Sequence, residues 1–282
     1  MIEVEDLPEL RAPVIIAAFE GWNDAAEAAS NLVEHLAQIW KARPVAAIDP
    51  EDYYDFQVNR PRVGWVDGER RISWPTTRVL LSQDTDFDRD VVLIQGIEPS
   101  TRWRSFIVEL LELAREVDAS LLVCLGALLA DVPHSRPFPV SVLSDDPQIA
   151  RRFQLDPSSY EGPTGIVGVL ADAARQAAIP VVSCWASVPH YAAGSASPKA
   201  TLALLHRLEG LLGTSLPAGE LPEEAAAWEK GVDQLASSDT EVADYVRTLE
   251  EAQDTADHPE ASGDAIAREF ERYLRRRGTE GI

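Results

Sequence analysis

The chain has 282 residues, of which 45% are hydrophobic and 26% are charged, values typical of a globular protein with a sizeable core. This length fits one large domain, or one domain with an appendage. The formal net charge of −22 argues against nucleic acid and anionic membranes as partners, because both would repel the protein.

Neither a targeting segment nor a cysteine site is expected. The N-terminal residues MIEVEDLPEL are acidic and lack a basic region ahead of an apolar one, so we expect no signal peptide and a cytoplasmic protein. The longest apolar or small run, residues 119–130, is too short to cross a bilayer. Cys124 and Cys184 lie singly in apolar runs, which predicts small buried side chains without a disulfide or a cysteine-rich metal site.

The first third of the chain alternates strand and helix patterns. An apolar run at 14–19 predicts a strand, and apolar residues at helical spacing over 25–39 predict a helix that Asn23 or Asp24 caps. A second short strand is predicted at 45–48. Residues 62–74 predict a β-hairpin around the two-residue turn Asp67-Gly68, which we expect at one edge of the sheet.

The middle of the chain continues this alternation, and the elements expected there are strands at 76–82, 91–95, 121–125, 139–143 and 181–185 and helices at 103–114, 146–153, 166–178 and 198–212. Alternating strands and helices of this kind predict an α/β protein.

Two stretches share one pattern and organise this prediction. Residues 120–142 read SLLVCLGALLADVPHSRPFPVSV and residues 179–191 read IPVVSCWASVPHY, so each runs a buried strand into Pro-His. We therefore expect His134 and His190 at equivalent strand ends. Ligand crevices of open α/β sheets lie beyond the carboxyl ends of the strands, so a site would be located there.

The composition changes after Gly219. Residues 220–282 contain 17 acidic and 7 basic side chains and no strand-like run, while helical periodicity is visible at 222–235, 240–252 and 264–276. The sequence therefore predicts an α/β sheet domain at 1–219 and an acidic helical appendage at 220–282. We expect the sheet domain to fold without the appendage.

Five motifs, in order, carry a family resemblance: FEGWNDA (19–25), GIEPSTRW (96–103), DVPHSRP (131–137), YEGPTGIVG (160–168) and WASVPHY (185–191). Together these motifs resemble those of the proteasome assembly chaperone 2 family in its prokaryotic branch, over roughly residues 13 to 213. The resemblance implies a three-layer α/β sandwich with a mixed central sheet, related to phosphorylase- and peptidyl-hydrolase-like folds, and it implies oligomerisation.

One family feature differs in this chain. Relatives that dock on proteasome α-rings use a C-terminal tail ending in a hydrophobic residue, a tyrosine and any residue, whereas this sequence ends RRGTEGI. The resemblance therefore implies contact with a proteasome only through another surface.

Ten polar residues fall at the expected strand ends and helix starts, and they form the candidate ligand crevice: Glu20, Asn23, Asp24, Glu98, His134, Arg136, Glu161, Thr164, His190 and Tyr191. Each also has a structural interpretation, because imidazoles tie turns to backbone groups and carboxylates at helix starts act as caps. The two Pro-His pairs, with Arg136 and Tyr191 beside them, favour a small anionic or amide ligand.

No complete catalytic constellation is present in the sequence. A nucleophile elbow, a P-loop and a dinucleotide fingerprint are absent, so we predict no catalytic, cofactor-binding or metal-ligating residues and no cofactor. The leading hypothesis is a non-catalytic, assembly-chaperone-like homo-oligomer or scaffold, with a trimer favoured and a protein client. The alternative is a small-molecule enzyme or binder that uses the crevice for nucleoside- or peptide-like compounds.

Overall fold

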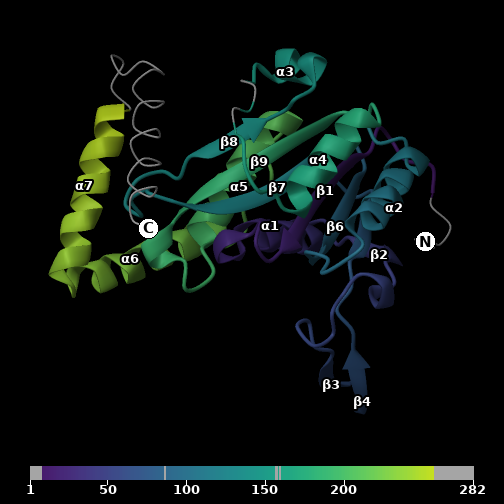
Figure 1. Cartoon of the computed structure of the whole chain (residues 1–282), viewed down its shortest axis with the longest axis horizontal. Coiled ribbons are helices and arrows are strands. Elements are labelled where there is room, and N and C mark those ends of the chain that lie inside the picture. The colour runs from purple at the N-terminus through teal and green to yellow at the C-terminus, as the bar shows by residue number, and fades with distance from the viewer. Residues whose placement is uncertain (1–7, 86, 156–157, 159, 257–282) are drawn as a thin grey trace, which may run out of the picture.

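In a computed structural model, residues 8–85, 87–155, 158 and 160–256 are described, and they build one seven-stranded sheet with helices on both faces (Figure 1). The strands are β1 (Val14–Glu20), β2 (Arg43–Ala47), β3 (Arg62–Val66), β4 (Glu69–Ser73), β5 (Arg78–Ser82), β6 (Val91–Ile97), β7 (Leu121–Ala130), β8 (Val140–Leu143) and β9 (Val181–Pro189). The α-helices are α1 (Ala28–Ile39), α2 (Trp103–Glu116), α3 (Pro147–Phe153), α4 (Ile166–Gln176), α5 (Pro198–Leu212), α6 (Leu221–Ser237) and α7 (Thr240–Ala256). Short 3-10 turns are η1 (Ala25–Glu27), η2 (Pro50–Asp52) and η3 (His190–Ala192).

The sheet is mixed, in the order β2-β5-β6-β1-β7-β9-β8. Strands β6, β1, β7 and β9 pair in parallel at its centre. At the two sides the pairing is antiparallel: β5 pairs with β6, β2 with β5, and β8 with β9. Parallel strands are buried on both faces and read as continuous apolar runs, and this explains sequences such as VIIAAF and LLVCLG.

Two hydrophobic cores lie on opposite faces of the sheet. Alternate residues of β1 divide between them: Val14, Ile16 and Ala18 pack toward α1 and α5, while Ile15, Ala17 and Phe19 pack toward α2 and α4. The predicted three-layer α/β sandwich is therefore confirmed.

Both cysteines are free and buried on neighbouring strands, as expected. Burial raises the pKa of the Cys184 thiol to about 12. Within the described ranges, no helix is long and apolar enough to cross a membrane.

The predicted hairpin forms, but it makes a sheet of its own. Strands β3 and β4 pair antiparallel around Asp67 and Gly68, whose φ angles of 51° and 80° match the left-handed conformation that a two-residue hairpin turn requires. The hairpin leaves the chain between β2 and β5, at one side of the large sheet, and projects from the body (Figure 1).

Two of the three C-terminal helices are observed as α6 and α7. Helix α6 packs on α5 and continues the core through Leu221, and α7 packs on α6. The third predicted helix, at 264–276, and the terminal RRGTEGI lie outside the described residues. The proposed boundary at residue 220 stays a prediction.

Candidate functional site

The two Pro-His turns meet at one rim of the sheet. Strands β7 and β9 are parallel neighbours, with Ala130 opposite Pro189, so their ends deliver both turns to the same place. The side chain of Tyr191 stands between the imidazoles: its ring centroid lies 5.7 Å from that of His134 and 5.8 Å from that of His190. The predicted equivalence of the two strand ends is confirmed.

His134 is only 2% exposed and is bonded on both ring nitrogens. Its Nδ1 lies 2.8 Å from the Tyr191 hydroxyl and its Nε2 lies 3.0 Å from Oδ1 of Asp233 on α6. The His134 backbone N–H also donates to the Tyr191 hydroxyl at 2.8 Å. A neutral imidazole that donates from Nε2 to Asp233 and accepts the phenol proton at Nδ1 satisfies every one of these contacts.

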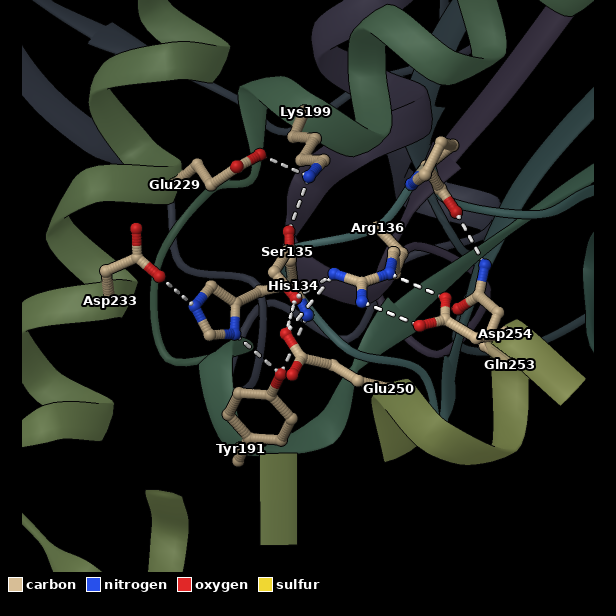
Figure 2. A network of polar contacts seen from close by, with 11 residues as sticks. His134, Ser135, Arg136, Tyr191, Lys199, Glu229, Asp233, Glu250, Gln253 and Asp254 are labelled. Carbon is tan, nitrogen blue, oxygen red and sulfur yellow. Dashed lines mark hydrogen bonds and ion pairs between the residues drawn. The ribbon is translucent and has the colours of Figure 1, made fainter. Parts of the chain in front are cut away.

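The residues after His134 bind helix α7 (Figure 2). The Ser135 hydroxyl donates to Glu250, and the Arg136 guanidinium donates from Nε and Nη2 to the two carboxylate oxygens of Asp254, both at 2.8 Å. Such a two-pronged pair is the strongest geometry available to arginine and carboxylate. Gln253 adds a bond of 3.2 Å to the Pro137 carbonyl oxygen.

A lysine completes the attachment. Nζ of Lys199, on α5, donates to the His134 carbonyl oxygen and pairs with Glu229 on α6. The same ammonium lies 5.1 Å from the ring centroid of Phe138. The ring centroids of Phe138 and Trp228, on α6, are 5.9 Å apart. Residues 131–138, here called the docked loop, therefore hold α6 and α7 on the sheet domain.

His190 differs from its counterpart. Its side chain is 46% exposed, and its Nδ1 lies 3.3 Å from Oδ1 of Asp131, an oxygen that also accepts a bond of 3.0 Å from the Tyr245 hydroxyl. The His190 and Tyr245 rings are 5.5 Å apart. This imidazole sits at the surface of the seam between the docked loop and α7.

Three of the predicted crevice residues organise helix starts. Asp24 accepts bonds from the backbone N–H groups of Ala29 and Ser30, at 2.7 and 3.1 Å, and so caps the first turn of α1. The α-helix itself begins at Ala28, after the 3-10 turn η1, and not at residue 25 as predicted. Glu98 Oε1 accepts from Asn23 Nδ2 at 2.6 Å and from the first N–H of α4 at 2.8 Å. Burial raises the pKa of Asp24, while its hydrogen bonds act in the opposite direction.

Gly165 explains part of the GPTG sequence. A Cβ atom at this position would lie 2.2 Å from Oδ1 of Asn23, closer than packed atoms approach. Only glycine lets the α4 start lie against the loop after β1.

The ten predicted residues thus divide. His134, Arg136, His190 and Tyr191 meet around the docked loop; Asn23, Asp24 and Glu98 support the starts of α1 and α4; and Glu20 and Glu161 lie exposed at the surface. Desolvation of its carboxylate by neighbouring atoms raises the pKa of Glu20, and the nearby charges of Asp24 and Glu27 raise it further.

A separate groove of about 980 Å³ lies beside β7, β8, β9 and α4. Thr164 is the one predicted crevice residue that lines it. Other groove residues are Trp22, Leu128, Leu129, Tyr160 and Trp185. In the described part of the chain, no group of three or more His, Cys, Asp or Glu side chains is arranged to hold a metal ion.

Sequence reasoning missed the acidic partners of the docked loop. Glu229 and Asp233 are four residues apart on α6, and Glu250 and Asp254 are four apart on α7, so each pair occupies one helix face. This spacing was the available signal. It also missed Leu128 and Leu129, because β7 continues to Ala130, past the expected end at residue 125.

The comparisons with known proteins agree with this fold. The chain resembles the crystal structure of a PAC2 family protein from Streptomyces avermitilis, with 57% identity and a TM-score of 0.79 over 83% of this chain and 99% of that one. A proteasome-assembly chaperone homologue from Mycobacterium tuberculosis is 49% identical, with a TM-score of 0.75 over the same shares, 83% and 99%. PbaB from Pyrococcus furiosus, an archaeal proteasome activator, has 15% identity and a TM-score of 0.64 over 83% of this chain and 98% of that one, which shows a common fold.

No curated protein matches the chain. The family model described as "PAC2 family" matches residues 18–236, which include the docked loop, the groove and all of α6 except Ser237. The resemblance seen in the five motifs is therefore confirmed, and this chain belongs to the prokaryotic branch of the PAC2 family.

Proposed function

We propose that this protein is a non-catalytic homo-oligomer of the assembly-chaperone type, which acts in the cytoplasm by binding a protein client. Family membership supports this role, because a Mycobacterium relative that shares about half of the sequence is a proteasome-assembly chaperone homologue. A trimer is the favoured oligomer.

The observation that carries the proposal is the use made of the docked loop. His134 and Arg136, two of the predicted crevice residues, and Ser135 between them bind acids of α6 and α7. Polar groups that are already hydrogen-bonded within the chain would have to break those bonds to bind a substrate. They are therefore poor substrate anchors. Their role here is to hold two helices in place.

Those helices offer a surface to a partner. Their outward-facing acids include Glu223, Glu224, Glu241, Asp244 and Glu251, all exposed. A client with a basic or neutral surface fits this face, because complementary charge speeds association and excludes wrong partners.

Light scattering on the purified chain at micromolar concentration tests the oligomer. We expect a mass of several chains, and a mass of 30.9 kDa at every concentration would contradict the proposal.

Client binding is tested separately by substituting Glu241 and Asp244 with lysine, which should weaken binding of a basic client while leaving the oligomer mass unchanged.

The small-molecule alternative stays a prediction, and the groove is the observation in its favour. A volume of about 980 Å³ with aromatic walls is within the range of ligand pockets. Thermal-shift measurements with nucleosides and short peptides test it: a rise in melting temperature that Thr164→Val abolishes would support this alternative, and no rise with any compound would count against it.

A further inference from the structure

The exposed apolar side chains of this protein are concentrated in two places. Among the residues that the structure describes, twelve large hydrophobic side chains are exposed. Five are on the β3–β4 hairpin and the residue that follows it, residues 62–74, here called the arm (Val63, Trp65, Val66, Ile72 and Trp74), and four line the groove (Trp22, Leu128, Leu129 and Tyr160). Exposed apolar clusters of this kind mark interaction surfaces.

The arm presents one apolar face. Val63 lies opposite Ile72 in the β3–β4 register and Trp65 lies opposite Arg70, so side-chain alternation puts Val63, Trp65 and Ile72 on the same side. Trp65 is 76% exposed. An isolated two-stranded hairpin is marginally stable in water, so this ribbon gains from a surface that covers it.

The arm also differs in charge from the rest of the protein. Residues 62–74 contain three arginines against one aspartate and one glutamate, a net charge of +1 in a chain of −22. Arg70 is on the apolar face, opposite Trp65. Tryptophan and arginine are the residues most enriched at the centres of protein interfaces.

The groove is at the other side of the sheet. The arm leaves the chain between β2 and β5, whereas β7, β9 and β8 line the groove, and β2 and β8 are the two edges of the sheet. Figure 1 shows the arm projecting away from β8 and α3. The groove also contains Asp145 and Asp172 against Arg175, a net charge of −1 opposite in sign to that of the arm.

We propose that the arm of one copy of this chain binds in the groove of a second copy. Two different surfaces meet in such a contact, so it is head-to-tail, and head-to-tail contacts close into rings when the rotation between copies allows it. Trp65 and Ile72 are the anchors, Leu128 and Leu129 receive them, and Arg70 faces the groove acids. This inference rests on the proposed homo-oligomeric function and assigns its interface.

Complementary variants test the contact. The arm variant Trp65→Glu/Ile72→Glu keeps an intact groove, and the groove variant Leu128→Glu/Leu129→Glu keeps an intact arm. We expect each alone to have the mass of one chain, 30.9 kDa, by light scattering, and an equimolar mixture to recover a species of two chains. Circular dichroism checks that both variants are folded.

Matched controls are available elsewhere on the surface. Val108→Glu on α2 and Leu235→Glu on α6 each place the same charge at an exposed apolar position outside the arm and the groove, and both should keep the wild-type mass.

The outcomes separate the two proposals. A monomeric wild-type chain overturns both the homo-oligomeric function and this interface. An oligomeric wild type whose arm variant keeps the same mass overturns the interface alone and assigns the arm to another partner. Variants that are both monomeric but do not associate on mixing also overturn it, because arm and groove then do not meet each other.

Discussion

The docked loop and the arm differ in how far other parts of the chain cover their side chains. The docked loop is rich in polar groups, yet His134 at its centre is 2% exposed and bonded on every side. The arm carries two tryptophans, yet Trp65 is 76% exposed. The motif that suggests a ligand site is internal, whereas the one that suggests packing is open to solvent.

This contrast follows from the charged partners of the docked loop and from the position of the arm in the fold. The docked loop lies against helices whose acids pair with its histidine and arginine, so its polar groups find partners within the chain. The arm is a two-residue-turn hairpin that leaves the body between β2 and β5, where nothing in the described chain covers its apolar face. A polar motif is thus no guide to a binding site unless its neighbours are known.

Removing residues 220–282 should have the largest effect on this contrast, because it uncovers the docked loop. We expect the sheet domain to remain folded, with a melting temperature lowered by about 10 °C, since the contacts of Leu221 and Trp228 are worth roughly 3–5 kcal/mol and each kcal/mol corresponds to about 2–4 °C at this size. Circular dichroism shows whether the shortened protein is folded, and calorimetry measures its melting temperature.

A matched deletion sharpens that result. Replacing the arm, residues 62–74, by a short Gly-Ser linker should give a melting temperature within about 3 °C of that of the monomeric arm variant Trp65→Glu/Ile72→Glu, because the arm side chains are exposed. Insoluble protein after removal of 220–282 would show that α6 and α7 instead complete the core.

The two histidines allow a smaller, single-residue comparison. His134→Ala should lower the free energy of unfolding by about 2–3 kcal/mol, because it leaves a cavity at a position that is 2% exposed and removes the ring partner of the Tyr191 hydroxyl. His190→Ala should cost less than about 0.5 kcal/mol, because its side chain is 46% exposed. Urea unfolding measures both, and equal losses would contradict the assignment of different roles.

Much of the fold was predictable because its signals are local. The apolar runs of β1 and β7 indicate buried parallel strands, Asp67-Gly68 indicates the hairpin turn, and Asp24 indicates the start of α1. Each of these depends on neighbours within a few residues. The parallel pairing of β7 with β9 followed from their matching sequences, so the meeting of His134 and His190 was predictable too.

The partners of those histidines were not predictable in the same way. Asp233 is 99 residues from His134 and Asp254 is 118 from Arg136, and no local pattern links positions so far apart. Leu128 and Leu129 illustrate a second reason: their sequence is indistinguishable from that of a core strand, and only the tertiary structure decides whether another element covers them.

Tyr191 gives the smallest and most specific test of the docked loop, through its titration. Burial raises the pKa of Tyr191 to about 12; the bond from the His134 backbone acts against this, and the charges of Glu250 and Asp233 add to it. In the unfolded chain a tyrosine releases its proton near pH 10. Between pH 10 and pH 12 the folded state therefore holds the proton that the unfolded state has lost.

Because the folded state binds more protons in that range, stability should fall as the pH rises from 10 to 12, and it should be unaffected by this group below pH 10. The side chain is partly exposed, so we expect an effect of about 1 kcal/mol after solvent screening. Tyr191→Phe removes the titrating group, so the difference in free energy of unfolding between wild type and this variant should shrink by about 1 kcal/mol between pH 10 and pH 12. For the arm variant Trp65→Phe, the free energy of unfolding should depend on pH as it does in the wild type. Parallel curves for Tyr191→Phe as well would mean that the docked loop opens to solvent like the arm.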